Sequence, residues 1–349
     1  MTHTTSPLQM AQAIGVTLGL GAIGLISHSQ TNNTGQIQDA LNGSLQSAYE
    51  AGFDAANPLQ DIAISTFGAV RWAVFGQGMK EVVVGADGWL FSSEEWAMSE
   101  DFDARLTQSV QKITKARDTL ADQGIDLIVV AVPDKSEVYA HMLDIPVPAK
   151  VASRRDVFVT SLSTENIAVV DAYETLNIGA STTFTYQRDD THWSPEGAQL
   201  VASEIAQLAQ SMETELTSAE VTITETGTRP HDGDLLKFAE TGVFRAWLGP
   251  EQSQIATFET EIITSGDLFS AAPIDVALVG TSFSAKPEWH FADFVQGALG
   301  AEAINYAQEG RGPFVPMQDM LASETFETTP PKLVIWEIPV RYTTLEISK

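Results

Sequence analysis

The sequence predicts an α/β domain in which helices cover both faces of a mostly parallel sheet, a three-layer sandwich. The main observation is a set of continuous apolar runs of strand length, at residues 125–133, 167–173, 274–283 and 332–339. Continuous rather than alternating runs are expected where both faces of a strand are buried. Helical patterns separate these runs, near residues 150–164, 195–215 and 316–323. Strands that alternate with helices in this way favour a parallel sheet.

Two further elements precede the first of these strands. The segment EVVVGADGWLFSS (81–93) predicts a strand, a tight turn at Asp87-Gly88 and a second strand. Residues 103–123 carry apolar side chains at helical spacing, and Gly124 follows as a helix stop signal. A hairpin and a long helix are therefore expected ahead of the central sheet.

The segment from Met10 to Ile26 is free of charged residues and almost wholly apolar. Its length lies at the lower edge for a membrane-spanning helix and at the upper edge for the core of a signal peptide. No Lys or Arg precedes it, and no small-residue cleavage site follows it. We expect an uncleaved membrane anchor; a cleaved signal and a buried helix are the alternatives.

The chain accordingly divides into three segments. Residues 1–28 form the membrane anchor or signal segment, and residues 29–75 form a tether, polar at its start, with a leading helix. Residues 76–349 form the main domain, which holds all the apolar strands described above.

Charge and cysteine content narrow the functional classes. The 349 residues include 46 Asp or Glu and 19 Lys or Arg, which gives a formal net charge of -27. Such a chain repels phosphate backbones, so nucleic-acid binding is not expected. A high-salt habitat explains the acidity equally well. The absence of cysteine excludes disulfides, thiolate metal sites and a cysteine nucleophile.

The first segment that suggests chemistry is RDDTHWSPEGAQLVA, residues 188–202. Ser194 followed by proline is typical of a helix N-cap and first helical position. In an extended chain, residues two apart project to the same side, which lets Asp190 reach His192 and fix its tautomer. A tighter turn would bring Asp189 to the histidine instead. The alternative to a catalytic pair is a satisfied surface histidine beside a helix cap.

The second segment is IDVALVGTSFSAKPEW, residues 274–289. Its apolar strand runs into Gly280-Thr281-Ser282, and the carboxyl end of a parallel strand is where such folds place ligand sites. The backbone N–H of the serine is suited to stabilise an oxyanion. The pattern differs from the G-x-S-x-G elbow because Ser284 replaces the second glycine and the serine follows the histidine. Taken alone, the motif is also compatible with an ordinary strand exit.

Together the two segments supply a nucleophile, a base and an orienting acid, namely Ser282, His192 and Asp190. Among the histidines outside the N-terminal region, only His192 has an aspartate two residues before it and a Ser-Pro helix start signal after it. His231 neighbours two aspartates in PHDGDL, which suggests a metal, although a solvated turn is the expected interpretation. We therefore expect neither a metal nor a cofactor.

Six collinear segments together resemble the alginate O-acetyltransferase family, the AlgJ/AlgX-like proteins. They are GADGWLF (85–91), VAVPDKSEVYAH (130–141), DDTHWSPEGA (189–198), HDGDLLKF (231–238), VGTSFS (279–284) and VIWEIPVRY (334–342). The resemblance implies an SGNH-hydrolase-like fold with a permuted motif order, in which Asp-x-His precedes the serine. No carbohydrate-binding module follows residue 349, so we expect the AlgJ branch rather than the AlgX branch.

The resemblance also implies roles for particular residues. Asp190 and His192 match the family's Asp-x-His pair, and Ser282 matches its nucleophile. Tyr342, or the adjacent Arg341, falls where the family places a further active-site residue. Residues 76–349 are accordingly expected to form an SGNH-like O-acetyltransferase domain.

The reaction implied is ping-pong acetyl transfer during exopolysaccharide modification in the periplasm, with the chain anchored in the inner membrane. His192 would deprotonate Ser282, which takes acetyl from a donor supplied by a membrane-bound acyltransferase. The acetyl group then passes to a polysaccharide hydroxyl or to a partner transferase. Arg311 and Gly312 are candidates for substrate contacts, because glycines in their loop let the backbone approach closely. A simple turn is the alternative there.

Two other functions remain open on the sequence alone. A secreted carbohydrate acetylesterase would use the same triad and differ only in whether water reaches the acyl-enzyme. A non-catalytic glycan-binding or assembly protein would retain the fold without the chemistry. The overall acidity disfavours direct capture of a long polyuronate relative to transfer to a protein partner or a neutral glycan.

Overall fold

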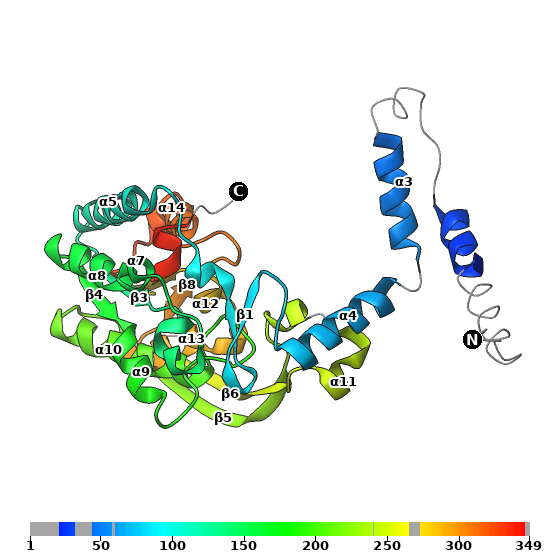
Figure 1. Cartoon of the computed structure of the whole chain (residues 1–349). Coiled ribbons are helices and arrows are strands. Elements are labelled where there is room, and N and C mark those ends of the chain that lie inside the picture. The colour runs from blue at the N-terminus through cyan, green and yellow to red at the C-terminus, as the bar shows by residue number, and fades with distance from the viewer. Residues whose placement is uncertain (1–20, 32–43, 58–59, 240, 265–272, 346–349) are drawn as a thin grey trace, which may run out of the picture. The chain divides into compact units, whose positions relative to one another are not determined.

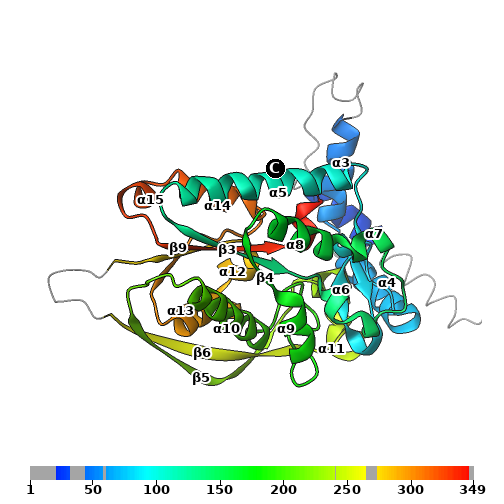
Figure 2. The same cartoon turned by 90° about the vertical axis from the view of Figure 1, so that its left-hand side faces the viewer.

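The computed structural model describes residues 21–31, 44–57, 60–239, 241–264 and 273–345. The chain forms two compact units. Unit 1 comprises Met1–Gly78 and Ala239–Gly249, and unit 2 comprises Met79–Phe238 and Pro250–Lys349. Figures 1 and 2 show the elements of both units in two views.

Unit 2 contains a five-stranded sheet with the order β4-β3-β9-β7-β8, in which every pairing is parallel. Its strands are β3 (Asp126–Val132), β4 (Ala168–Asp171), β7 (Val276–Val279), β8 (Ala303–Asn305) and β9 (Leu333–Pro339). The four apolar runs correspond to β3, β4, β7 and β9, which confirms the predicted parallel sheet. The edge strand β8 was not predicted, because its three residues are too few to give a periodic signal.

Successive residues of β3 enter two separate cores. Ile128 and Val130 pack with α10 (Pro195–Ser211) and α13 (Phe291–Leu299). On the other face Val129 packs in a cluster formed by three more helices. These are α5 (Phe102–Ala121), α8 (Arg154–Thr164) and α14 (Phe314–Leu321). Figure 2 shows the two helical layers on either side of the sheet. The three-layer sandwich is confirmed, and burial on both faces explains the continuously apolar strands.

Two antiparallel pairs accompany the sheet. The predicted hairpin consists of β1 (Val82–Val84) and β2 (Leu90–Ser92), joined by a turn at Ala86–Gly88. A longer ribbon of β5 (Ala219–His231) and β6 (Ser253–Thr264) was not predicted. Most residues of β5 are exposed or half-buried, so they form no apolar run. This ribbon packs against α13 and carries His231 at the end of β5.

Two local details differ from the expectation. The helix expected near 150–164 is broken at Ser153 into α7 and α8. The strand predicted over 274–283 ends at Val279, and a short helix begins at Ser282. The shorter helices of unit 2 are α6 (Lys135–Val138), α7 (Ala149–Ala152), α9 (Ala172–Gly179), α12 (Ser282–Ala285) and α15 (Glu324–Thr328).

Unit 1 is helical in its described parts. Residues 21–30 form a helix, and α3 (Ser44–Ala55), α4 (Gln60–Phe75) and α11 (Arg245–Leu248) complete the unit, with a short 3-10 helix η5 (Gly242–Phe244) before α11. Most of the predicted anchor lies outside the described residues, which begin at residue 21. Within the described part of the chain, no helix combines the length and the apolar character needed to cross a membrane.

Candidate active site

Ser282 is the first residue of α12 and follows β7, an inner strand of the sheet, after a two-residue turn. Thr281 is the N-cap of this helix, and its side chain accepts a hydrogen bond from the backbone of Phe283. Gly280 precedes it, and a β-carbon at that position would collide with the carboxylate of Glu337. The strand-to-helix junction therefore places Ser282 at the carboxyl edge of the sheet, where such folds bind ligands.

His192 contacts Ser282 directly. Its Nε2 atom lies 2.7 Å from Oγ of Ser282, and its Nδ1 atom lies 2.6 Å from Oδ1 of Asp190. An ionised carboxylate can only accept, so Nδ1 carries the proton and Nε2 accepts from the serine hydroxyl. The three side chains form one hydrogen-bonded series in the order that nucleophilic catalysis requires.

The segment before α10 is a folded turn rather than a free loop. A short bridge joins Tyr186 to Trp193, and the Ser194 side chain caps α10 by accepting from the backbone of Gly197. Within this turn Asp190, and not Asp189, contacts His192.

The Asp189 side chain takes no part in this arrangement. Its carboxylate oxygens are buried and accept no hydrogen bond from the described part of the chain. The Asp189 backbone carbonyl accepts a hydrogen bond from the backbone N–H of Leu235 at 3.2 Å.

The carboxylate of Asp190 accepts four hydrogen bonds. Oδ1 accepts from the backbone and ring of His192, and Oδ2 accepts from Nε2 of His231 at 3.0 Å and from the backbone of Asp234 at 2.9 Å. Burial by itself would raise the pKa of Asp190. The bonds from the two histidines outweigh burial and hold that pKa well below its ordinary value. Asp190 is therefore ionised at neutral pH and suited to stabilise an imidazolium.

His231 is one of the site residues that the sequence did not predict. Its buried ring lies edge-on to Trp289, which stacks in turn on the ring of His192. The residue reaches the site only because the ribbon β5–β6 ends there, and that ribbon gave no clear signal. Its place in the PHDGDL segment was the available hint, and the expected solvated turn is not what the structure contains.

Asp234 completes the polar surroundings of His192. Its Oδ1 atom accepts from the backbone and hydroxyl of Thr191 at 2.8 and 3.0 Å, and its Oδ2 atom lies 3.8 Å from Nδ1 of His192. Ligand atoms of Asp190, His192 and Asp234 lie within 4.8 Å of one another, a spacing compatible with a cation. Nδ1 of His192 carries a proton that it donates to Asp190, and both oxygens of Asp190 and Oδ1 of Asp234 already accept hydrogen bonds, so the cluster is explained without one.

A cavity of about 240 Å³ adjoins Ser282 and His192. Arg341 and Tyr342 line it, together with Glu94. The structure thus brings the first pair of expected substrate-binding residues to the nucleophile.

The second expected pair, Arg311 and Gly312, does not line this cavity. Arg311 is 54% exposed in its side chain, and its guanidinium lies 3.8 Å from Asp319. Gly312 has a φ of 62° in a turn before α14.

Arg341 is almost wholly buried, with 2% of its surface exposed. Its guanidinium lies 3.6 Å from Asp134, which also binds Arg154, and 5.5 Å from the ring centre of Phe283. Burial would lower the pKa of Arg341, but Tyr342 and the surrounding carboxylates raise it, so the residue stays charged. A buried guanidinium, flanked by the carboxylates of Asp134 and Glu94, therefore lines the same cavity as the nucleophile.

Lys135 holds the turn that carries Asp190. Its Nζ atom is fully buried and lies within hydrogen-bond distance of four backbone carbonyls, which share its three N–H donors. These carbonyls belong to Leu90 (2.6 Å), Gln187 (2.5 Å), Arg188 (3.0 Å) and Asp190 (3.0 Å). Burial lowers the pKa of Lys135 to about 8, although nearby acids oppose this shift. Sequence reasoning assigned Lys135 no role, because a buried lysine cannot be recognised from its neighbours in the chain.

Glu337 supports the turn on the nucleophile side. It is fully buried in β9 and accepts from the backbone of Thr281 at 2.7 Å and from the hydroxyl of Ser284 at 3.0 Å. Burial raises the pKa of Glu337 to about 7, against the opposing effect of these hydrogen bonds. Residues on both sides of Ser282 are therefore tied to one carboxyl group.

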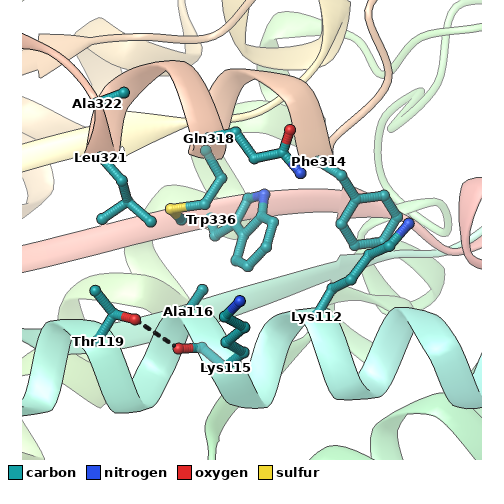
Figure 3. Close-up of a pocket in the computed structure, with 10 residues that line it drawn as sticks. Lys112, Lys115, Ala116, Thr119, Phe314, Gln318, Leu321, Ala322 and Trp336 are labelled. Carbon is teal, nitrogen blue, oxygen red and sulfur yellow. Dashed lines mark hydrogen bonds between the residues drawn. The ribbon is translucent and has the colours of Figure 1, made fainter.

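A second cavity, of about 400 Å³, lies between α5 and α14. Figure 3 shows Lys112 of α5 reaching Phe314 of α14, Lys115 pointing toward Trp336, and Trp336 lying between the two helices. No histidine, serine or carboxylate lines this cavity. Its size is greater than that of the first cavity, but it lacks the groups that acyl transfer requires.

The fold and the site define the class of SGNH-hydrolase-like proteins. The family model described as SGNH hydrolase-like domain, acetyltransferase AlgX, matches residues 82–340. The chain belongs to this acetyltransferase family and is an O-acetyltransferase.

Individual relatives agree with this assignment. The chain is similar to the probable alginate O-acetylase AlgJ of Azotobacter vinelandii, with 34% identity over 98% of this chain and 90% of that protein. The AlgJ protein of Pseudomonas aeruginosa is 34% identical over 86% of this chain and 80% of its own length.

The solved structures show the same relationship. The O-acetyltransferase domain of Pseudomonas putida AlgJ superposes with a TM-score of 0.70 at 29% identity, covering 77% of this chain and 94% of that domain. Pseudomonas aeruginosa AlgX follows with a TM-score of 0.58 at 26% identity, covering 74% of this chain and 62% of that one. The expected closeness to the AlgJ branch is confirmed.

Proposed function

We propose that this chain transfers acetyl groups to alginate, directly or through a partner transferase, by way of an acetyl-serine formed on Ser282. The observation that carries the proposal is the 2.7 Å contact between Oγ of Ser282 and Nε2 of His192, a nucleophile beside its base. The AlgJ relatives, described as probable alginate O-acetylases, supply the substrate class.

In the first half-reaction, Nε2 of His192 takes the hydroxyl proton as Oγ of Ser282 attacks the acetyl carbonyl of the donor. Asp190 stabilises the imidazolium through Nδ1. His192 then returns the proton to the leaving oxygen of the donor, and the acetyl-serine ester remains. In the second half-reaction His192 deprotonates the acceptor hydroxyl, which attacks the ester and releases Ser282.

The oxyanion formed in each step needs hydrogen-bond donors near Ser282. The backbone N–H of Ser282 lies in the first turn of α12, where helical N–H groups have no partner within the helix. We assign it as one donor. The buried guanidinium of Arg341 and the hydroxyl of Tyr342 are assigned to substrate binding in the adjoining cavity.

The acceptor is a polyuronate, so its carboxylates face a chain of net charge -27. Arg341 lines the cavity beside Ser282 and is the cation that we assign to binding an acceptor carboxylate there. A fixed guanidinium suits carboxylate recognition because it offers several donors in one plane.

We further propose that the protein works in the periplasm. In this scheme residues 1–28 anchor it in the inner membrane, residues 29–75 act as a tether with a leading helix, and residues 76–349 form the transferase domain. A membrane-bound acyltransferase supplies the acetyl donor. The support is the charge-free stretch from Met10 to Ile26 and the family to which the chain belongs.

The test is an acetyl-transfer assay with the full chain, a chromogenic acetyl ester as donor and alginate oligosaccharides as acceptor. We expect acetylated oligosaccharides by mass spectrometry, and no product from Ser282→Ala. Release of acetate without transfer would identify an acetylesterase instead. Equal donor consumption by both proteins would remove Ser282 from the mechanism.

A further inference from the structure

Large apolar side chains are unusually exposed in unit 1. More than half of those that are exposed in the described part of the chain belong to this unit. The longest series lies on α4, at Phe67 (67% exposed), Val70 (48%), Val74 (66%) and Phe75 (66%). Exposed apolar groups that are scattered need no explanation, but a contiguous group marks a surface that contacts something.

The exposed residues of α4 form one stripe. At 100° per residue, Phe67, Val74 and Phe75 fall on the same side of the helix. The opposite side buries Ser65 and Ala69 against the rest of unit 1. Here η5 approaches closely: Gly242 has a φ of 42°, and a β-carbon on it would collide with Ser65. The apolar stripe is therefore the outer face of a packed helix.

The neighbouring helix α11 extends this surface. It packs against α4, as Figure 1 shows, and exposes Trp247 (79%) and Leu248 (45%). The preceding η5 adds Val243 at 62% exposure. We call the exposed side chains of α4, η5 and α11 the apolar face of unit 1.

The charges of this face differ from those of the whole chain. Residues 62–75 and 241–250 contain no Asp or Glu, although the chain has 46 of them. Their charged residues are Arg71 and Arg245. The Arg71 guanidinium lies 5.7 Å from the ring centre of Phe67, within the stripe itself. Asp61, in the first turn of α4, and Glu240 and Glu251 bound these two stretches of sequence. The exposed apolar residues named above therefore lie in stretches that carry no carboxylate of their own.

We propose that the apolar face of unit 1 lies in the headgroup region of a phospholipid bilayer. Tryptophan and phenylalanine favour this region, because their rings enter the acyl boundary. Carboxylates would be repelled by anionic lipid, and none occurs in these segments. The charge-free stretch from Met10 to Ile26 belongs to the same compact unit.

The experiment uses the full chain in vesicles of phosphatidylcholine and phosphatidylglycerol, and measures tryptophan quenching by lipids brominated on their acyl chains. We expect wild-type fluorescence to be quenched and Trp247→Phe to lose a distinct part of that quenching. Trp336→Phe is the matched control, because Trp336 is buried in β9 with 1% exposure. This substitution should leave the lipid-dependent quenching unchanged.

A second readout is quenching by iodide in the aqueous phase. Trp247 should be accessible to iodide in detergent-free solution and protected once vesicles are added. If Trp247→Phe shows the same bromolipid quenching as the wild type, or if Trp247 stays accessible to iodide on vesicles, the lipid assignment is wrong and a protein partner must cover the face. Neither measurement depends on Ser282, so these experiments test membrane contact independently of the proposed transfer reaction.

Discussion

The carboxylate of Glu337 accepts a hydrogen bond of 2.7 Å from the backbone N–H of Thr281, and this contact ties β9 to the residue that precedes the candidate nucleophile. The same carboxyl group accepts from Ser284, two residues after Ser282. The Glu337 carboxyl group thus fixes residues on both sides of Ser282 without a hydrogen bond to Ser282 itself. The absence of a side chain at Gly280 leaves room for this carboxyl group.

The buried carboxyl group makes stability depend on pH in a specific way. The folded-state pKa of Glu337 is about 7, above the ordinary value of 4.5. Its favourable contribution is complete below pH 4.5 and is lost as pH rises through 7. Relative to Glu337→Gln, the wild type should lose up to about 3 kcal/mol of unfolding free energy across this window. Urea unfolding at several pH values measures the difference, with Glu309→Gln, at an exposed site, as control. A difference that does not vary with pH would show that Glu337 keeps one charge state.

The choice between Asp190 and Asp189 is tested by two amide substitutions. Asp190→Asn removes the acceptor of Nδ1–H on His192 and favours the wrong tautomer. In serine proteases the same change lowers kcat by about 10⁴. Asp189→Asn should leave the rate nearly unchanged, because its carboxylate accepts no hydrogen bond among the described residues. Hydrolysis of a chromogenic acetyl ester measures both. A crippled Asp189→Asn with an active Asp190→Asn would reverse the assignment.

His231 should act through Asp190 and not on the substrate. A hydrogen bond to an ionised carboxylate, such as that from His231 to Asp190, contributes about 1.5–3 kcal/mol. If this energy is lost in the transition state, His231→Ala should lower kcat about tenfold to hundredfold. KM for the acetyl ester should change little. His141→Ala, at an exposed histidine, is the control. If His231→Ala raised KM while kcat stayed constant, His231 would be a substrate contact.

Lys135 should be essential for stability although it is distant in sequence from the residues it holds. Lys135→Met leaves four buried carbonyls without their common donor. We expect a loss of at least about 3 kcal/mol in unfolding free energy. Lys115→Met, at an exposed lysine of α5, should be nearly neutral. Similar urea midpoints for the two variants would contradict a structural role for the buried ammonium group.

The sequence predicted the parts of the fold that carry strong local signals. The buried strands β3 and β9 are long and continuously apolar, so they could be recognised without tertiary information. The ribbon β5–β6 could not, because Thr and Glu occupy most of the exposed positions of β5 and the ribbon is stabilised by strand pairing and by contact with α13. The three-residue β8 is defined only by its neighbour β7.

The site residues likewise divide into those with a local sequence signal and those without one. Asp190 and His192 are two residues apart and precede a helix cap, so local geometry suggested their pairing. His231, Lys135 and Glu337 reach the site from separate elements, and nothing in their immediate sequence shows where those elements meet. Residues that meet only in the folded structure cannot be recognised from their neighbours in the sequence.

Arg341 and Arg311 were both expected to contact substrate, and only Arg341 lines the cavity beside Ser282. Arg341→Lys keeps the charge but loses the planar set of donors, so KM for alginate oligosaccharides should rise about tenfold, as expected when a charged hydrogen bond weakens. KM for an uncharged acetyl ester should stay the same, because that donor has no carboxylate to bind. Arg311→Lys is the matched control: its side chain is largely exposed beside Asp319, and neither KM should change. Initial rates at varied acceptor and fixed donor separate the two constants. An acceptor KM that rises for Arg311→Lys and not for Arg341→Lys would place the polysaccharide on the loop before α14.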